Sequence, residues 1–156
     1  MENKVGKDLS PDEIKACLVV LKEGDAVDVK AAERELPRAV TVAVVRVGKD
    51  VVGIGAIKRQ RPFYAKRIAG AKCSGFSFDP NMHELGYVAV RKANRGGQSG
   101  PIVDSLLRTF KGPLWATTFD DRMKSTLEHR DFVQRGKEWP SENGKHQVSL
   151  WIKESK

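Results

Sequence analysis

The chain has 156 residues, of which 40% are hydrophobic and 31% are charged. This length fits a single domain over residues 1–156 with its own core, and the dense apolar runs exclude disorder as the main state. No apolar stretch approaches the roughly 18–20 residues that span a bilayer. Residues 1–4 lack the apolar core of a signal peptide. We expect a soluble, cytoplasmic protein that makes no membrane contact.

The net charge of +8 lies almost wholly in the middle third of the chain. Residues 51–103 carry 9 basic and 2 acidic side chains, a net of +7, against −1 for residues 1–50 and +2 for residues 104–156. Such a local positive field suits an anionic ligand: a nucleotide cofactor, a nucleic acid or an acidic peptide. Six of the cations crowd one segment, either as a solvated basic face, which is favoured, or as a contact for a second, anionic partner. They are Lys58, Arg59, Arg61, Lys66, Arg67 and Lys72.

The first half of the chain predicts two helices and a hairpin. Ser10-Pro11-Asp12-Glu13 has the pattern of a capping box, with a helical apolar face after it and Gly24 as its end. Asp28 is a second N-cap, for a short helix that ends at Pro37. The β-branched run Val40–Val47 predicts a strand, joined by a turn at 48–50 to a second strand over Val51–Ile57.

The second half predicts alternating strands and helices. A short helix is expected near Tyr64–Ala69, and the following segments complete the pattern. Strands are expected over Glu84–Val90, Leu114–Thr118, Phe132–Gly136 and Gln147–Ile152, and helices over Ser99–Phe110 and after Asp120 or Asp121. This order describes one α/β domain.

The cysteines and tryptophans favour packing roles. Cys17 lies on the apolar face of the first helix, and Cys73 lies in a basic loop that could activate a thiol, although plain packing is favoured there too. No Cys/His spacing suits a metal. The tryptophans are scattered rather than interleaved with the basic run, so they are expected in the core. They are Trp115, Trp139 and Trp151.

The segment from Glu84 to Gly100 carries the chemistry. An apolar strand runs into a loop that holds Gly96, Gly97 and Gly100, and a helix begins directly after it. Glycines let backbone N–H groups approach a ligand closely, and a helix N-terminus adds partial positive charge. Together they suit a pyrophosphate, with the Arg95 cation at the mouth; a plain strand-to-helix turn is the alternative.

Here the sequence resembles the GNAT superfamily of acyl-CoA-dependent N-acyltransferases. That family shows a strand ending in Val-x-Val and then Arg/Gln-x-x-Gly-x-Gly/Ala opening a helix; this chain has Val88-Ala89-Val90 and then Arg95-Gly96-Gly97-Gln98-Ser99-Gly100. Gln98 stands where the family usually has Gly. The resemblance covers about residues 8–153. It implies an α/β fold with a single mixed, centrally splayed β-sheet flanked by helices.

The resemblance also implies a cosubstrate, acetyl-CoA, and the residues that bind it. Its pantetheine arm would pair with the backbone of Val88 and Val90, beside a partner strand near Thr117. Its pyrophosphate would meet the N–H groups of the glycine loop. The cofactor-binding residues are expected to be Val88, Ala89, Val90, Arg95, Gly96, Gly97, Gln98, Ser99, Gly100 and Thr117.

For catalysis, the resemblance implies direct acyl transfer to a primary amine with a general base. Glu84 is the matching carboxylate, with a surface ion pair as the alternative, and His83 is a candidate proton relay. A backbone N–H near Tyr87 or Val88 would polarise the carbonyl. The usual acid, a Tyr, is replaced by Leu127, so Tyr87, Ser125 or Thr126 are the candidates; the alternative is that the thiolate leaves and is protonated by water.

The acceptor is left open, as a small molecule or a protein. Glu33 and Glu35 could hold a cationic amine, although a polar helix face is favoured. Two alternatives to an acetyltransferase remain: a GNAT-like module that binds acyl-CoA without turnover, and a protein associated with tRNA or another nucleic acid. A homodimer is also possible by analogy with the superfamily.

Overall fold

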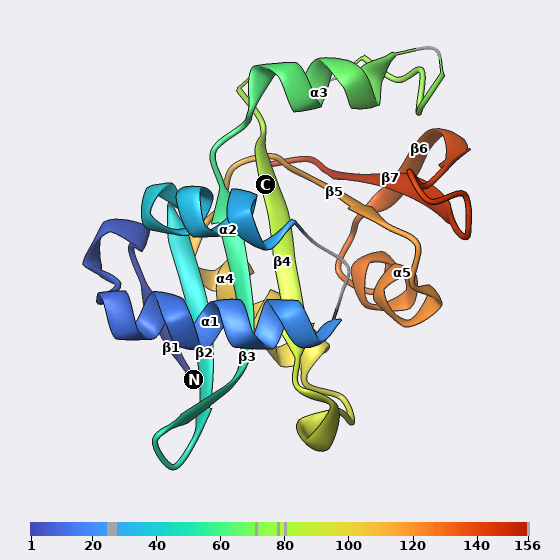
Figure 1. Cartoon of the computed structure of the whole chain (residues 1–156). Helices are drawn as coiled ribbons and strands as arrows, with labels where there is room; N and C mark the ends of the chain where they lie inside the picture. Colours follow the sequence, from blue (N-terminus) through green and yellow to red (C-terminus); the bar gives the residue numbers. More distant parts are fainter. Residues whose placement is uncertain (25–27, 71, 78, 80, 156) are drawn as a thin grey trace. The chain divides into compact units, whose positions relative to one another are not determined.

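The computed structural model describes residues 1–24, 28–70, 72–77, 79 and 81–155. Within these residues, seven strands form one open sheet in the order β1-β2-β3-β4-β5-β7-β6 (Figure 1). The strands are β1 Glu2–Lys4, β2 Thr41–Val47, β3 Asp50–Lys58, β4 His83–Val90, β5 Leu114–Thr118, β6 Val133–Pro140 and β7 Gln147–Lys153. The α-helices are α1 Pro11–Gly24, α2 Val29–Glu35, α3 Pro62–Ala69, α4 Ser99–Thr109 and α5 Asp121–Glu128.

The chain divides into two compact units, and β4 contributes to both. Unit 1 consists of residues 1–59 and 85–111, and unit 2 consists of residues 60–84 and 112–156. The predicted α/β class with a mixed, open sheet and flanking helices is confirmed. The expectation of a single domain over residues 1–156 stays a prediction.

Unit 1 is built on the β2–β3 hairpin. The two strands pair antiparallel from Thr41↔Ile57 to Val47↔Asp50, with a bulge at Val45/Arg46. Helices α1 and α2 cover one face of these strands and α4 covers the other (Figure 1). A sheet covered on both faces needs apolar residues throughout, and this explains why residues 40–47 show no polar alternation.

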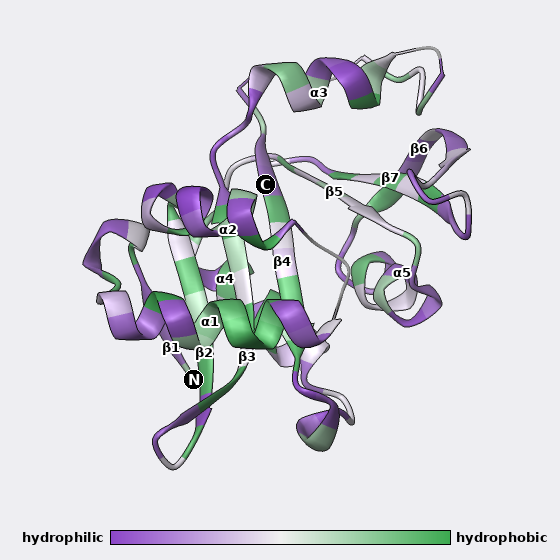
Figure 2. Ribbon diagram, in the orientation of Figure 1, coloured by the Kyte–Doolittle hydropathy of each residue, from purple (hydrophilic) through white to green (hydrophobic). Residues whose placement is uncertain are grey.

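The core of unit 1 is almost entirely aliphatic. Most of its buried side chains come from α1, α2, β2 and β3, and the apolar colouring of these strands is plain in Figure 2. The strand β3 meets α4 closely at Gly55: a Cβ there would lie 2.4 Å from Cγ2 of Ile102 and 3.1 Å from Cδ1 of Leu106. Glycine at this position therefore allows the helix to lie close against the sheet.

Both predicted helix caps of unit 1 are present. Glu13 N–H donates to Ser10 Oγ at 3.1 Å, and Ser10 N–H donates to Glu13 Oε1 at 3.0 Å, so the capping box is reciprocal. The Asp28 carboxylate accepts from the N–H groups of Lys30 and Ala31 at 3.0 and 3.2 Å. Local sequence alone thus fixes where α1 and α2 begin.

Unit 2 contains the remaining strands with α3 and α5. β7 pairs antiparallel with both β5 and β6, and the first two residues of β4 pair parallel with β5, as His83↔Leu114 and Glu84↔Trp115. Two tryptophans are the largest buried side chains of this core, whereas the buried cluster described for unit 1 contains none. The buried members of the unit 2 core are Ala65, Ile68, Met82, Trp115, Trp139, Leu150 and Ile152.

The structure differs from the predicted elements mainly at the edges of the sheet. The strand β1 was not expected, because its three residues, Glu2–Lys4, are polar or charged; it pairs with β2, and Asn3 exchanges hydrogen bonds with Ser105 of α4. The strand β6 runs four residues beyond the predicted Gly136, although only Trp139 in it is buried. Among the described helices, none has the length and apolar character that a membrane crossing requires.

Candidate active site

The most unusual backbone in unit 1 lies inside β4. Tyr87 has a φ of 53°, in the left-handed region that non-glycine residues rarely adopt. A residue in this conformation interrupts the alternation of a strand and turns the following N–H out of the regular ladder. The predicted position of a backbone donor is near Tyr87 or Val88, and the distortion falls at that place.

The side chain of Tyr87 is held in the core of unit 1. It is 8% exposed, and the ammonium of Lys58 lies 3.9 Å from the centroid of its ring. Lys58 is itself only 4% exposed. A cation over an aromatic face is attracted by the ring quadrupole, and more strongly where water is excluded. This contact holds the ring in place and so helps to fix the strained backbone of Tyr87.

The three residues after Tyr87 are half-buried and so remain accessible along the strand. Val88, Ala89 and Val90 keep intermediate exposure, and the strand then ends where Arg91 N–H donates to the carbonyl of Val52 at 2.8 Å. The carbonyl of Val90 accepts from Nε of Arg95 at 3.2 Å. A carbonyl has two lone pairs, so this contact still leaves an acceptor site on Val90.

The predicted glycine loop, Arg95–Gly100, connects this strand to α4. Gly96 and Gly97 have φ values of 136° and 91°, and a Cβ built on either residue meets nothing within 4 Å. The loop ends at Gln98, the N-cap of α4, whose side chain makes no capping bond. Ser99 and Gly100 then form the first turn of the helix. The loop thus exposes backbone next to the N-terminus of α4, a helix of eleven residues. Such a setting favours the binding of an anion.

A carboxylate of α1 contacts two residues beside the loop, one through its backbone N–H and one through its cation. Glu23 accepts from the backbone N–H of Lys92, and its other oxygen accepts from Nε of Arg91 at 3.2 Å. The bond from Lys92 N–H, followed by Arg91, lowers the pKa of Glu23. These groups line an open hollow with Asp50, Val52, Ala93 and Asn94. The charge of Arg91 is therefore partly offset within unit 1.

The predicted general base lies in unit 2, where β4 pairs with β5. The side chain of Glu84 is 5% exposed, and its Oε1 lies 3.9 Å from Nη2 of Arg61. Arg61 precedes α3, and its guanidinium carbon lies 4.4 Å from the centroid of the Tyr64 ring. The carboxylate is therefore buried, and the ion pair that was its alternative role is present with Arg61, whose side chain is 31% exposed.

Tyr64 is a site residue that the sequence analysis did not identify. Its ring stacks on Trp115 at 5.8 Å between centroids, and a side-chain hydrogen bond joins it to Thr117 of β5. Burial, then the charge of Glu84, raises the pKa of the Tyr64 hydroxyl. The spacing of Arg61, Tyr64 and Arg67 at i, i+3 and i+6 places all three on one helix face, and this was the available signal.

The remaining predicted residues take structural positions. Leu127 is fully buried on α5, and Glu33 is exposed on α2, as the packing interpretations expected. Cys17 is buried, which raises the pKa of its thiol to about 11, and Cys73 packs at the edge of the core of unit 2. His83 is half-buried, and its backbone N–H donates to the carbonyl of Pro113.

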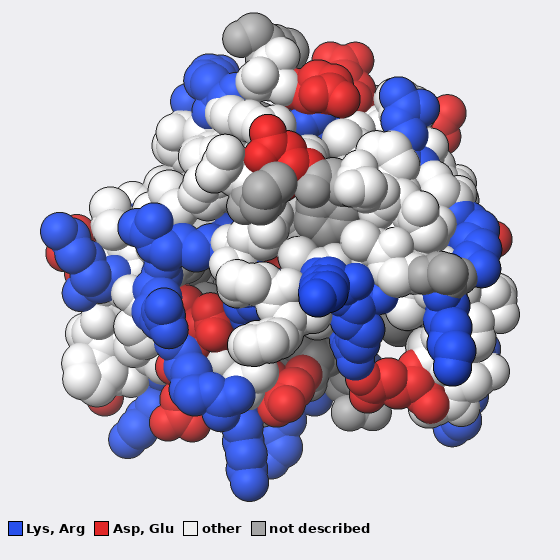
Figure 3. Space-filling view, turned by 90° about the horizontal axis from the view of Figure 1, so that it is seen from above, with Lys and Arg blue, Asp and Glu red and all other residues white. Residues whose placement is uncertain are grey.

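Four of the six cations in residues 58–72 contact other groups of the protein. Beyond Lys58 and Arg61, Arg59 donates to the carbonyl of Arg38 at 3.2 Å, and Arg67 binds Glu142 at 2.9 Å. Figure 3 shows Lys and Arg interspersed with Asp and Glu on the face drawn there. The cluster is therefore partly structural in origin and does not need a polyanion to explain it.

Comparison with known proteins finds the fold and no close relative. No protein-family model and no curated protein sequence matches the chain. In solved structures, however, its fold is that of the GNAT N-acyltransferases. The chain is similar to an acyl-CoA N-acyltransferase from Pseudomonas aeruginosa, at 12% identity and a TM-score of 0.70 over 97% of both chains. It is similar to a GNAT acetyltransferase from Streptococcus agalactiae, at 12% identity and a TM-score of 0.70 over 99% of this chain and 95% of that one. An aminoglycoside 6'-acetyltransferase type Ii matches at 14% identity and a TM-score of 0.65 over 99% of this chain and 97% of that one.

Proposed function

We propose that the protein is an N-acyltransferase that moves an acyl group, with acetyl as the first candidate, from acyl-CoA to a primary amine. The observation that carries this proposal is the combination in unit 1 of a strand broken at Tyr87 and a glycine loop that opens α4. The broken strand supplies a backbone donor for a thioester carbonyl, and the loop supplies backbone for a pyrophosphate. The fold of the structures to which the chain is similar supports the same function.

The donor would be held mostly by backbone. Val88–Val90 would pair with the pantetheine arm, and the N–H groups from Arg95 to Gly100 would meet the pyrophosphate, with Thr117 of β5 as the expected partner-strand residue. The conformations of Gly96 and Gly97 suit such a role, because no side chain covers their backbone. The guanidinium of Arg95 adds charge at the same place.

The proposed reaction needs one base and one proton donor. Glu84 accepts the proton of the acceptor amine, directly or through a water, so that the nitrogen lone pair attacks the thioester carbonyl carbon. A backbone N–H at Tyr87 or Val88 stabilises the oxyanion of the tetrahedral intermediate. The C–N bond forms, and the C–S bond breaks with its electron pair on sulfur. The attacking nitrogen gives up its remaining extra proton, which passes through water to the thiolate, and the products are free CoA and an amide.

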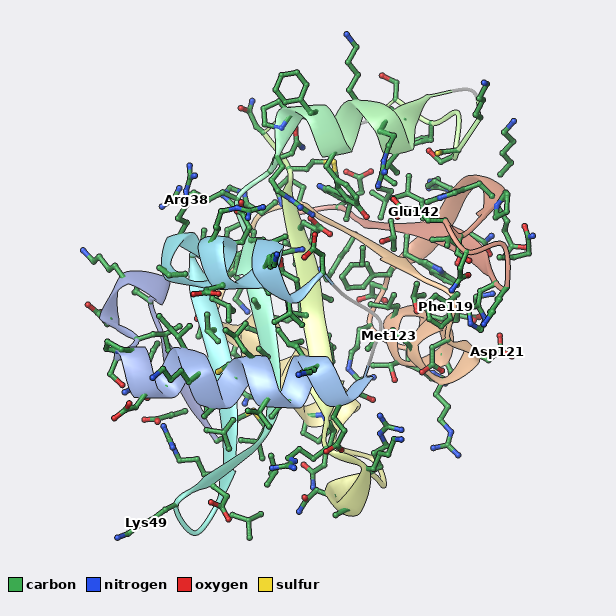
Figure 4. All side chains as sticks on the ribbon, viewed as in Figure 1. Arg38, Lys49, Phe119, Asp121, Met123 and Glu142 are labelled. Atoms are coloured by element: carbon green, nitrogen blue, oxygen red, sulfur yellow. The ribbon has the colours of Figure 1, made fainter. Side chains whose placement is uncertain are left out.

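Calorimetric titration with acetyl-CoA, desulfo-CoA and ATP tests the donor site. We expect both CoA ligands to saturate one site and ATP to bind much more weakly. Gly97→Ala should weaken CoA binding at least tenfold, because alanine at a φ of 91° is strained and displaces the loop. Gly48→Ala is the matched control, since Gly48 also has a positive φ, of 62°, but lies in the hairpin turn next to Lys49 (Figure 4). Equal binding of all three ligands, or none, contradicts the proposal.

A further inference from the structure

The α3 cluster, which we define as Arg61, Tyr64 and Arg67, holds two cations over one aromatic ring. The guanidinium carbon of Arg61 lies 4.4 Å from the centroid of the Tyr64 ring, and that of Arg67 lies 5.1 Å from it. The ring is fixed in turn by its stack on Trp115 and its hydrogen bond to Thr117. Two guanidinium groups are therefore positioned by a platform that rests on β5.

A buried carboxylate lies next to this platform. Oε1 of Glu84 is 3.9 Å from Nη2 of Arg61, which is close enough for attraction but beyond hydrogen-bond length. The two partners differ in exposure, at 5% for Glu84 and 31% for Arg61. A guanidinium carries five N–H donors in a planar fork, so one distant carboxylate oxygen uses little of its capacity.

Arg67 has a partner that a ligand could replace. It binds Glu142, in the loop after β6 (labelled in Figure 4), at 2.9 Å, and both side chains are largely exposed, at 55% and 86%. Exposed ion pairs of this kind contribute little to stability. A ligand anion that approaches the Tyr64 ring can therefore compete with Glu142 for the Arg67 guanidinium.

We propose that the α3 cluster selects acceptors in which an anionic group lies close to the reacting amine, with free α-amino acids as the first candidate. The amine would lie at Glu84 and the carboxylate at Arg61, with Arg67 as its second cation. This inference rests on the proposed function, because it assigns the acceptor of that reaction. A zwitterion of this size can place its amine against the Glu84 carboxylate and its own carboxylate against Arg61, and the guanidinium fork matches a carboxylate in a bidentate manner.

The same arrangement predicts rejection of amines that lack the anion. Such an amine reaches Glu84 but leaves the guanidinium of Arg61 without the anion that it would otherwise bind, so discrimination follows from the missing partner. A phosphate beside an amine offers similar charge with a different shape. Carboxylate and phosphate acceptors are therefore separate arms of the test.

The test compares acceptors that differ only in the anion. Release of free CoA from acetyl-CoA would be followed with a panel of L-amino acids, with their amides, and with phosphoethanolamine against ethanolamine. The amine of an amino-acid amide is less basic than that of the free acid and more of it is deprotonated near neutral pH, so chemistry alone favours the amide. We expect kcat/KM to favour the acid at least tenfold for the best side chain in the panel.

Variants then assign the preference to the cluster. Arg61→Gln should reduce the ratio of acid to amide to near one, mainly through the KM of the acid, and Arg61→Lys should restore only part of it because lysine lacks the fork. Lys66→Gln is the matched control: it removes the same charge from an exposed position of α3 and should leave the ratio unchanged. Thermal midpoints of all variants would be compared with that of the wild type.

Failure of this inference is distinct from failure of the proposed function. Transfer to amides as well as to acids, or an unchanged ratio in Arg61→Gln, overturns the inference while the acyltransferase stands. A preference for phosphoethanolamine over every amino acid overturns the carboxylate assignment. Where the protein transfers no acyl group at all, calorimetric titration with L-amino acids and their amides decides the inference alone: equal binding of the two, or none, overturns it.

Discussion

The two compact units fill their interiors with different chemistry. Unit 1 packs aliphatic side chains between α1, α2 and α4 and offers a ligand mostly backbone, at β4 and at the glycine loop. Unit 2 packs tryptophan and tyrosine around a buried carboxylate, and it offers charged side chains on α3. In the proposed function, the backbone of unit 1 would hold the pyrophosphate of the donor. The charged side chains of unit 2 would then contact the acceptor.

The largest expected effect comes from the carboxylate of unit 2. Glu84→Gln should lower turnover more than tenfold, and by up to about 10⁴-fold if it removes the base entirely, while calorimetry shows unchanged binding of acetyl-CoA. Glu154→Gln, at an exposed position after β7, serves as the control. Wild-type turnover of Glu84→Gln across the pH range would show that Glu84 is not the base. It would also contradict the assignment of donor binding to unit 1 and base catalysis to unit 2.

Two glycines test how tightly each unit is packed. Gly55→Ala in unit 1 would force Ile102 and Leu106 to move, and Gly136→Ala in unit 2 would place a Cβ 2.4 Å from the carbonyl oxygen of Ser74 at a φ of 70°. Each should lower the free energy of unfolding by about 1–3 kcal/mol in urea denaturation. Gly144→Ala is the control for Gly136, since its φ is 71° and nothing lies within 4 Å of the added carbon.

The same experiment shows whether the units unfold together. All three tryptophans lie in unit 2, so their fluorescence reports that unit, whereas far-ultraviolet circular dichroism reports both. We expect coincident transitions for the wild type and for Gly55→Ala, because the strand β4 contributes residues to both units. A Gly55→Ala transition that moves by circular dichroism alone would show that the units unfold separately.

A smaller effect concerns the charge network at the start of unit 1. Glu13 binds Lys4 at 2.8 Å and Arg46 at 2.9 Å, and the bond from Lys4, followed by that from Ser10 N–H, lowers its pKa from 4.5 to about 2. A lowered native pKa means that the contribution of Glu13 to stability is complete above pH 4.5 and is lost as the pH falls toward 2. Glu13→Gln should therefore be less stable by about 1 kcal/mol at pH 7 and should show a flatter stability curve over this range. A parallel curve for wild type and variant would contradict this account of the network.

The smallest effect compares one helix cap from each unit. Asp120 caps α5 through Arg122 N–H at 2.8 Å, as Ser10 caps α1. Ser10→Ala and Asp120→Ala should each lower the free energy of unfolding by about 1 kcal/mol. Lys22 on α1 and Lys66 on α3 are exposed and cap no helix, so Lys22→Ala and Lys66→Ala serve as controls. Each should change the free energy of unfolding by less than about 0.5 kcal/mol. Equal losses in all four variants would show that the capping bonds contribute little.

What the sequence predicted well depends on neighbouring residues. The capping box of Ser10, the Asp28 cap and the hairpin between β2 and β3 all rest on interactions within a few positions, so single-sequence patterns are sufficient for them. The resemblance to the GNAT superfamily, which rests on the strand and glycine loop near residue 90, predicted the fold as well. The roles of the site residues within that fold stay predictions.

What the sequence missed depends on distant partners. The strand β1 has no apolar pattern and exists because it pairs with β2. Tyr64 lies 51 positions from Trp115, on which it stacks, and nothing in the local pattern of α3 identifies that partner. The end of β6 was missed because seven of its eight residues are exposed, as in a sheet edge that charged residues protect.

The close approach of Gly136 to Ser74 has a consequence for the motions of α3. Lys137 N–H donates to the carbonyl of Ser74, and the Ser74 hydroxyl donates to the carbonyl of Ile68 in α3. One residue thus ties the last turn of the helix to the edge strand β6. In hydrogen–deuterium exchange, the amides of Ser74 and Lys137 should therefore lose protection at a common rate, as one cooperative block. Any opening of α3 would then carry the edge of the sheet with it.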